Sequence, residues 1–296
     1  MEVVLSAGAF HRPTLVFILS ENRSGSQWLA YVLGSHRGAA YLGEYRRWFT
    51  KPDRTFCNLC AARHAPDCEI LSGIRQIPRD RAFDFAFDRL GRSILIDSSK
   101  RLDWAAHFVN DPRYQVRIVH LLRDPRGWFA SERRRTPFSA SAAARRWVRT
   151  NCQISEFIAS RRLDATSVFY DDLAVDPEQH FSPLCDFLGF RHEPAALEYW
   201  STDHHGPGGN GPALNVTGES NSANITTGDD AFYLAAFRRS FYDTRWLAQL
   251  SPRDRDAIER SPMIQRLLTR YRRDFAHFDG LLAAADATAT ADCNQT

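Results

Sequence analysis

The sequence contains no hydrophobic run long enough for a membrane span. The longest apolar stretch near its N-terminus covers residues 14–19, whereas a membrane helix needs ~20 apolar residues. The first dozen residues also lack the charged segment and the long apolar segment of a secretory signal. We therefore expect a cytoplasmic protein without a membrane span.

The sequence also lacks an excess of either charge, and it is nearly free of lysine. Its 38 lysines and arginines stand against 35 acidic residues, which leaves a net charge of +3. This balance excludes a polycation that binds nucleic acid along its length. Only Lys51 and Lys100 are lysines, so a lysine at a strand end is a candidate functional residue.

A disulfide framework is absent as well. The chain has six cysteines, but Cys57, Cys60 and Cys68 crowd one short segment and the others are scattered. In a chain of 296 residues this distribution is typical of reduced thiols.

What the sequence does contain is a series of short apolar runs that alternate with helical patterns. Such runs are typical of strands covered on both faces, and the alternation predicts βαβ units with a parallel sheet. We predict a single α/β domain over residues 1–283 and a frayed tail at 284–296. The predicted strands cover 14–20, 93–97, 116–122 and 166–170, and the predicted helices cover 26–35, 101–109, 138–162 and 176–189.

Two irregular segments interrupt this pattern. A segment rich in proline and cysteine covers residues 50–72, and one dense in glycine, proline and asparagine covers 203–230. A loop as long as the second is usually a lid or disordered, and we expect the acceptor loops at 45–80 and 203–230. Helical pattern returns at 231–275, with Trp246 and Leu247 as the expected packing anchors.

The first predicted strand runs directly into a turn built from Arg23, Ser24, Gly25, Ser26 and Gln27. The first turn of the helix that follows has unpaired backbone N–H groups and a partial positive charge, which together bind anions. Glycine lets the backbone approach an anion, and the serines and the arginine add donors. The alternative is an ordinary serine N-cap. A Walker nucleotide loop is disfavoured because its first glycine and its lysine are missing.

A second anion-binding pattern lies at 118–135, IVHLLRDPRGWFASERRR. It begins as a strand, breaks at Asp124-Pro125 and resumes as a helix whose first turn the proline sets. Arg123 and Ser131 project beside that helix start, where a guanidinium and a hydroxyl can share one phosphate. The alternative is an ordinary strand-to-helix turn with an Arg–Asp pair.

These two patterns resemble the cofactor elements of the sulfotransferase family. Residues 23–26 match its 5′-phosphosulfate loop, [KR]-S-G-[ST]-[ST]-x-L, although Gln27 stands where the family has a hydroxyl residue. Arg123 and Ser131 match its 3′-phosphate element, R-[DN]-P-x5-S. The segment 169–190 resembles the family's Y-[DE]-D-L stretch, which we interpret as scaffold.

The resemblance covers roughly residues 14–210 and implies a P-loop-like, three-layer α/β fold with a central parallel sheet flanked by helices. It also implies a sulfotransferase that moves a sulfonate from 3′-phosphoadenosine-5′-phosphosulfate (PAPS) to a hydroxyl or amine. Residues 23–27, together with Arg123 and Ser131, would bind this cosubstrate. Carbohydrate, lipid, small phenol and protein tyrosine acceptors are all compatible with these elements, because selectivity lies in variable loops.

Sulfonate transfer needs a base for the acceptor and cations for the departing phosphate. Glu44 follows a short strand that we expect beside the phosphate loop, at the position where carbohydrate-type sulfotransferases have their glutamate base. The alternative is a surface glutamate paired with a neighbouring arginine. Lys100 ends another strand and matches a lysine of the family, so we assign Lys100 and Arg23 to charge stabilisation. His107 is a rival base, and His120 is predicted to be structural.

The second irregular segment contains a further pattern. His205, Gly209 and Asn210 resemble an H-x3-G-N element of bacterial sulfotransferases, although the arginine that usually follows is missing.

The segment 57–68 presents Cys57, Cys60, His64 and Cys68 as four ligands typical of structural zinc. Packed cysteines or a labile disulfide are the alternatives.

Two other classes of protein remain as rivals. A P-loop kinase or nucleotide hydrolase would use magnesium, for which no convincing residues are present. A non-enzymatic, zinc-stabilised binding module would use the cysteine segment to recognise nucleic acid or protein.

Overall fold

The computed structural model describes residues 12–51, 57, 59–60, 68–207 and 242–293, with side chains to residue 287. Its centre is a five-stranded sheet with the order β2-β3-β1-β4-β5, in which all neighbours run parallel. The predicted α/β fold with a parallel sheet is therefore confirmed. The strands are β1 (Thr14–Ser20), β2 (Ala39–Tyr41), β3 (Ile94–Asp97), β4 (Gln115–Leu122) and β5 (Ala165–Phe169).

The four strands predicted from apolar runs correspond to β1, β3, β4 and β5, with bounds shifted by no more than one residue. Every residue of β1 is buried, because β1 is central and both of its faces are covered. Since the strands are parallel, the turns that follow β1, β3 and β4 all lie at the carboxyl edge of the sheet, the edge at which open α/β sheets bind ligands.

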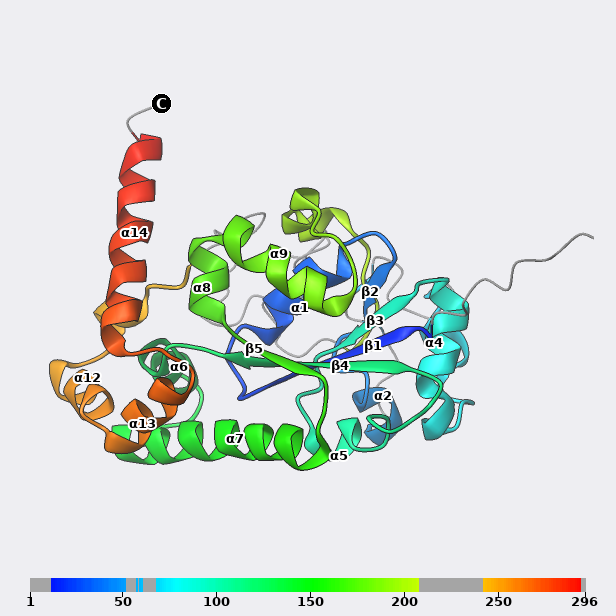
Figure 1. Cartoon of the computed structure of the whole chain (residues 1–296), viewed down its shortest axis with the longest axis horizontal. Helices are drawn as coiled ribbons and strands as arrows, with labels where there is room; N and C mark the ends of the chain where they lie inside the picture. Colours follow the sequence, from blue (N-terminus) through cyan, green and yellow to red (C-terminus); the bar gives the residue numbers. More distant parts are fainter. Residues whose placement is uncertain (1–11, 52–56, 58, 61–67, 208–241, 294–296) are drawn as a thin grey trace, which may run out of the picture.

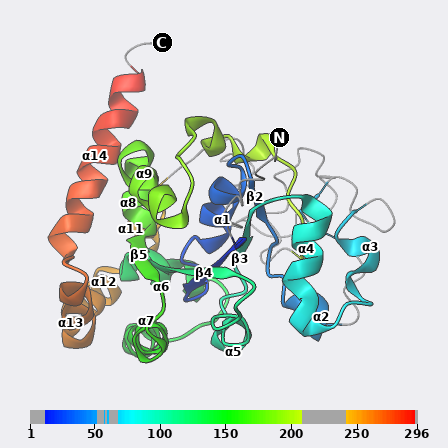
Figure 2. The same cartoon turned by 45° about the vertical axis from the view of Figure 1, so that its right-hand side comes forward.

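Helices cover both faces of this sheet and complete three layers (Figures 1 and 2). On one face lie α1 (Ser26–Gly34), α8 (Tyr170–Val175) and α9 (Pro177–Leu188), and on the other lie α5 (Leu102–Ala105) and the long α7 (Ala140–Arg161). The remaining helices are α2 (Arg47–Thr50), α3 (Leu71–Ile74), α4 (Ala82–Leu90), α6 (Pro125–Arg133), α11 (Trp246–Gln249), α12 (Pro252–Glu259), α13 (Pro262–Arg270) and α14 (Phe275–Cys293), with 3-10 turns η1 (Arg79–Arg81), η2 (Pro194–Leu197) and η3 (Tyr199–Ser201).

The C-terminal part differs from the prediction in two respects. Trp246 is buried as expected, but Leu247 is 48% exposed. Successive residues of a helix point about 100° apart, so a one-turn helix that buries Trp246 directs Leu247 outward. The tail expected to fray from residue 284 continues as helix α14 to Cys293.

Two further sequence predictions need adjustment. The helix expected at 101–109 is regular only in α5 and continues as turns. The short strand before Glu44 is β2, which pairs with β3 and not with β1, so it does not lie directly beside the phosphate loop.

Among the helices that the structure describes, none is long and apolar enough to cross a membrane.

A second hydrophobic core joins α6 and α7 to the C-terminal helices, and a fully buried arginine lies within it. The Arg126 guanidinium donates to the buried carboxylate of Asp124, with Nη2 and Oδ2 2.9 Å apart. It also bonds to Glu259 and Asp279 and lies 4.5 Å from the ring centroid of Trp246. The strand-to-helix turn after β4 is therefore tied to α12 and α14.

We predict that Arg126→Met lowers the free energy of unfolding by about 3–5 kcal/mol, because it leaves the Asp124 carboxylate buried without its cation. Urea unfolding followed by circular dichroism measures the change. Arg133→Met in the same helix is the control, since Arg133 is half exposed in its pair with Asp254 and such pairs contribute about 0–1 kcal/mol. Equal losses in the two variants would contradict the assignment.

Candidate functional site

The turn after β1 leaves the start of α1 open to an anion. Gly25 occupies the N-cap position with φ +89°, and no side-chain hydrogen bond caps the helix within the described part of the chain. The serine N-cap considered as the alternative is therefore not formed. Ser24 and Ser26 are both buried beside the turn, while Arg23 also has a positive φ of 67°. The backbone thus has the tight, left-handed form that a phosphate-binding turn uses.

Tyr170 packs directly against this turn. A Cβ atom at Gly25 would lie 2.5 Å from Cδ2 of Tyr170, so only glycine fits there. The Tyr170 ring also lies edge-on to Trp28 of α1 and beneath the guanidinium of Arg123, 4.8 Å from its centroid. Sequence reasoning treated this tyrosine only as scaffold, although its place in the Y-D-D-L stretch was the available signal.

The two predicted anion-binding elements are in direct contact. Arg123 donates from Nη1 to the carbonyl oxygen of Arg23, 3.0 Å away, although the two residues are 100 positions apart. Arg23 in turn donates from Nε to the hydroxyl of Ser131, also at 3.0 Å. Ser131 is buried. The structure therefore brings the residues of both elements into one cluster, as a ligand with two anionic ends requires.

Arg134 and Arg245 add two more guanidinium groups to this cluster. Arg134 donates to the Ser131 hydroxyl at 3.4 Å. Arg123 and Arg245 share the carboxylate of Asp243, at 3.2 Å and 2.8 Å. Burial alone would raise the pKa of Asp243, but the hydrogen bonds and charges of the two arginines hold that pKa well below its usual range. Asp243 is thus a negatively charged residue of the site, paired with two arginines, that the sequence analysis did not identify.

Arg123 has one donor without a partner. Its Nε is buried and has no hydrogen-bond partner among the described residues. Buried N–H groups in proteins are nearly always satisfied, so this atom is a candidate donor to a bound group. The side chain of Gln27 bonds within α1: its amide donates to the hydroxyl of Tyr31, one turn along the helix, at 3.1 Å.

Glu44 and Lys100 form a nearly buried ion pair at the same edge of the sheet. Lys100 Nζ lies 2.8 Å from Glu44 Oε1, and the two side chains are 12% and 13% exposed. The other carboxylate oxygen of Glu44 bonds to Arg47. Lys100 also donates to the carbonyl oxygen of Ser98 at 2.9 Å. The pairing with an arginine that was the alternative for Glu44 is therefore present, but the Glu44 side chain is nearly buried and bonds to Lys100 as well.

The two histidines considered for the base lie in contrasting environments. His107 is exposed beyond the end of α5. His120 is buried in β4, where its ring nitrogens contact Asn151 at 2.9 Å and Tyr271 at 3.2 Å. Burial lowers the pKa of His120 to about 4, which agrees with a structural role.

Three of the four predicted metal ligands gather in one place. Cys57, Cys60 and Cys68 lie together, and the fourth member of the group is His205, at the start of the segment 203–230. His64, which the sequence suggested as the fourth ligand, lies outside the described residues, as do Gly209 and Asn210 of the H-x3-G-N pattern.

The sequence matches no family model and no curated protein, but the fold matches solved structures. A sulfotransferase domain from the curacin biosynthetic pathway aligns with a TM-score of 0.56 and 16% identity, over 89% of this chain and 99% of that chain. A sulfotransferase domain from the Synechococcus PCC 7002 olefin synthase aligns with a TM-score of 0.49 and 21% identity, over 83% of this chain and 91% of that chain. A mouse sulfotransferase complexed with PAP aligns with a TM-score of 0.43 and 14% identity, over 92% of this chain and 88% of that chain. The likeness to the first shows the fold, so the sulfotransferase-like α/β fold implied by the sequence is confirmed.

We predict that Gly25→Ala lowers the free energy of unfolding by about 2–5 kcal/mol, because left-handed strain adds to overlap with Tyr170. Gly91→Ala is the control: Gly91 has φ +57° but nothing lies within 4 Å of its Cβ position, so strain alone costs about 1–2 kcal/mol. Chemical denaturation of both variants measures the difference. Indistinguishable losses would show that Tyr170 does not confine the turn.

Proposed function

We propose that the chain is a sulfotransferase that moves a sulfonate from PAPS to a hydroxyl or amine of an acceptor. The observation that carries the proposal is the direct contact of the two anion-binding elements, Arg23 with Ser131 and Arg123 with the carbonyl oxygen of Arg23. A nucleotide with phosphates at both its 3′ and 5′ positions needs two such elements side by side. The shared fold supports the proposal.

The residues present fit this cosubstrate. The uncapped start of α1 with Ser24, Gly25 and Ser26 would hold its 5′ side, where N–H groups and hydroxyls converge. Arg123, with its unsatisfied Nε, and Ser131 would hold the 3′-phosphate. Gln27 contributes less than the hydroxyl residue of the family, because its amide already donates to Tyr31.

When bound, PAPS supplies an activated sulfonate on a phosphate leaving group. In the proposed mechanism Glu44 takes the proton of the acceptor, and Lys100 and Arg23 stabilise negative charge that develops during transfer. The bond between Lys100 and Glu44 keeps both side chains in place beforehand. Breaking it frees one carboxylate oxygen to accept a proton and one ammonium to face an anion. Acceptors of the small-molecule, carbohydrate or lipid class fit this chemistry.

The first test is calorimetry with adenosine 3′,5′-bisphosphate. We predict micromolar-range binding by the wild type, weakened about tenfold or more in both Arg23→Ala and Arg123→Ala, because each loses a charged hydrogen bond worth about 1.5–3 kcal/mol. Arg92→Ala is the control, since Arg92 is exposed just before β3 at the opposite edge of the sheet. The proposal is wrong if the wild type does not bind adenosine 3′,5′-bisphosphate, or if it binds magnesium ATP in its place.

The second test separates catalysis from binding. We predict that Glu44→Gln slows release of adenosine 3′,5′-bisphosphate from PAPS about 10²–10⁴-fold, the usual contribution of a general base, across a panel of phenols, sugars and amines. Affinity for the bisphosphate should be unchanged. Glu156→Gln, an exposed glutamate on α7, is the matched control. A Glu44→Gln enzyme with full turnover would show that another group takes the proton.

A further inference from the structure

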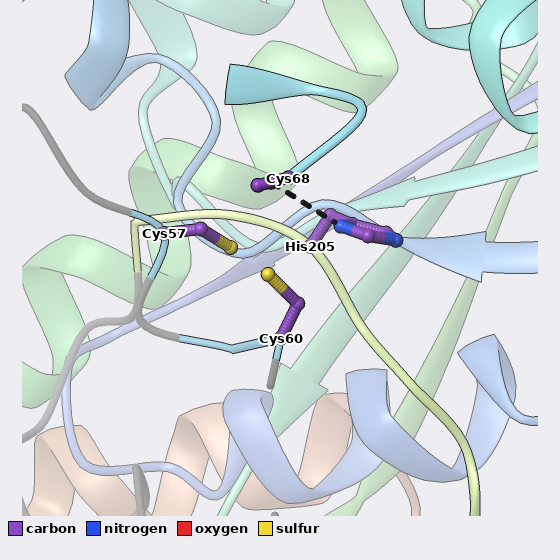
Figure 3. Close-up of side chains that lie close together, drawn as sticks. All are labelled: Cys57, Cys60, Cys68 and His205. Carbon is purple, nitrogen blue, oxygen red and sulfur yellow. Dashed lines mark hydrogen bonds between the residues drawn. The ribbon is translucent and has the colours of Figure 1, made fainter. Parts of the chain in front are cut away.

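Four soft ligands from two distant parts of the chain converge beside the candidate site. Cys57, Cys60, Cys68 and His205 are all buried, and one ligand atom from each lies within 4.8 Å of the other three. Figure 3 shows the cysteine side chains and the imidazole gathered around a common centre. The described cysteines are free thiols, so no disulfide accounts for the cluster.

The spacing is that of a tetrahedral metal site. With Zn–S at about 2.3 Å and Zn–N at about 2.0 Å, tetrahedral ligand atoms lie roughly 3.5–3.8 Å apart. Cys68 Sγ and His205 Nδ1 are 3.6 Å apart. The other separations need only small side-chain rotations to contract onto an ion, because all four groups already lie within 4.8 Å.

The histidine has the orientation that metal ligands have. Its Nδ1 faces the sulfur of Cys68, while its Nε2 lies 3.4 Å from a carboxylate oxygen of Glu69. A carboxylate beside the outer ring nitrogen favours the tautomer with its proton on that nitrogen, in which the inner nitrogen is free to bind a metal. Glu69 is therefore the positioning residue of the cluster.

Backbone donors point at two of the sulfurs. The N–H of Gly206 lies 3.1 Å from Cys57 Sγ, and the N–H of Leu71 lies 3.4 Å from Cys68 Sγ. An N–H donor can also bond to a metal-bound sulfur. The Cys57 sulfur also lies 3.5 Å from the carbonyl oxygen of Gly206, so the segment at 204–207 packs closely against the cluster.

We propose that Cys57, Cys60, Cys68 and His205 bind one structural zinc ion. Three thiolates and one imidazole in a tetrahedral arrangement are typical of zinc. All four coordination positions are filled by protein, which excludes a bound water and hence a catalytic role. Binding releases the protons of the cysteine thiols to solvent. His205 replaces the His64 that spacing along the sequence suggested.

This site would fasten the loop that carries Glu44. The segment 204–207 runs along the chain after β2: His205 N–H donates to the carbonyl oxygen of Tyr41 at 3.1 Å, and Glu44 N–H donates to that of Pro207 at 3.3 Å. Between them, a Cβ atom at Gly206 would lie 2.0 Å from the carbonyl oxygen of Leu42. The zinc therefore anchors both the cysteine segment and the backbone that holds Glu44.

Metal analysis of the full chain purified from zinc-supplemented cells tests the proposal. We expect about one zinc per chain by elemental mass spectrometry. His205→Ala and Cys60→Ser should lose most of it, while Cys152→Ser, a cysteine outside the cluster, and His64→Ala should keep it. A metal-free wild type, a metal other than zinc, or loss of zinc in His64→Ala with retention in His205→Ala would overturn the assignment.

Cobalt substitution keeps the test decisive if the ligand variants fold poorly. The wild type loaded with Co²⁺ should show the visible and thiolate-to-cobalt charge-transfer bands of a tetrahedral site with three thiolates. Glu69→Ala leaves all four ligands in place and should lower zinc affinity about 10–100-fold in competition with a chelator, as loss of an outer-shell partner does. An octahedral cobalt spectrum, or unchanged affinity in Glu69→Ala, contradicts the proposed geometry.

Hydrogen exchange measures the link to the Glu44 loop. Removal of the zinc should speed exchange of the Glu44 amide, which donates to Pro207, and leave the central β1 amides unchanged. Because metal content and amide exchange are measured without PAPS, their outcome is independent of the proposed transferase activity. An equally protected Glu44 amide in the metal-free protein would refute the anchoring role.

Discussion

The contact between the turn at Arg23 and the guanidinium of Arg123 is the interaction on which the candidate site depends. It exists because β1 and β4 pair directly and in parallel, so the turns that follow them begin at the same edge of the sheet. Tyr170 fills the space behind this contact and confines position 25 to glycine. The two halves of the proposed cosubstrate site are thus parts of one packed unit, and a shift of either strand moves both.

Charge at this edge is arranged before any ligand binds. Around Ser131 the hydroxyl accepts from Arg23 and Arg134, while the guanidinium of Arg123 is held by the carboxylate of Asp243. Around Glu44 one carboxylate is held by Lys100 and Arg47. Ion pairs in partly buried places are weakly screened and hold their partners in fixed positions. Such preorganisation lowers the reorganisation that a charged transition state would otherwise require.

The cysteine and histidine cluster links the least regular part of the chain to this ordered edge. Cys57 and Gly206 are 149 positions apart but exchange a backbone-to-sulfur hydrogen bond, and the residues beside Gly206 bond to the chain before and at Glu44. The described cysteines of this segment, Cys57, Cys60 and Cys68, are all buried beside His205. A metal site supplies a constraint with four side chains, which explains how an irregular insertion can border a site that needs exact placement.

The sequence by itself determined the features that depend on near neighbours. Apolar runs predicted four of the strands, and the turns at Gly25 and Asp124-Pro125 carried the signals of strand-to-helix junctions, because backbone conformation and burial follow from adjacent residues. Only the tertiary structure decided the partners: Tyr170 against Gly25, Asp243 on Arg123, β2 beside β3, the outward-facing Leu247, and His205 with the three cysteines. Such contacts join residues that are far apart in the chain, and packing selects them among chemically equivalent candidates that local spacing does not distinguish.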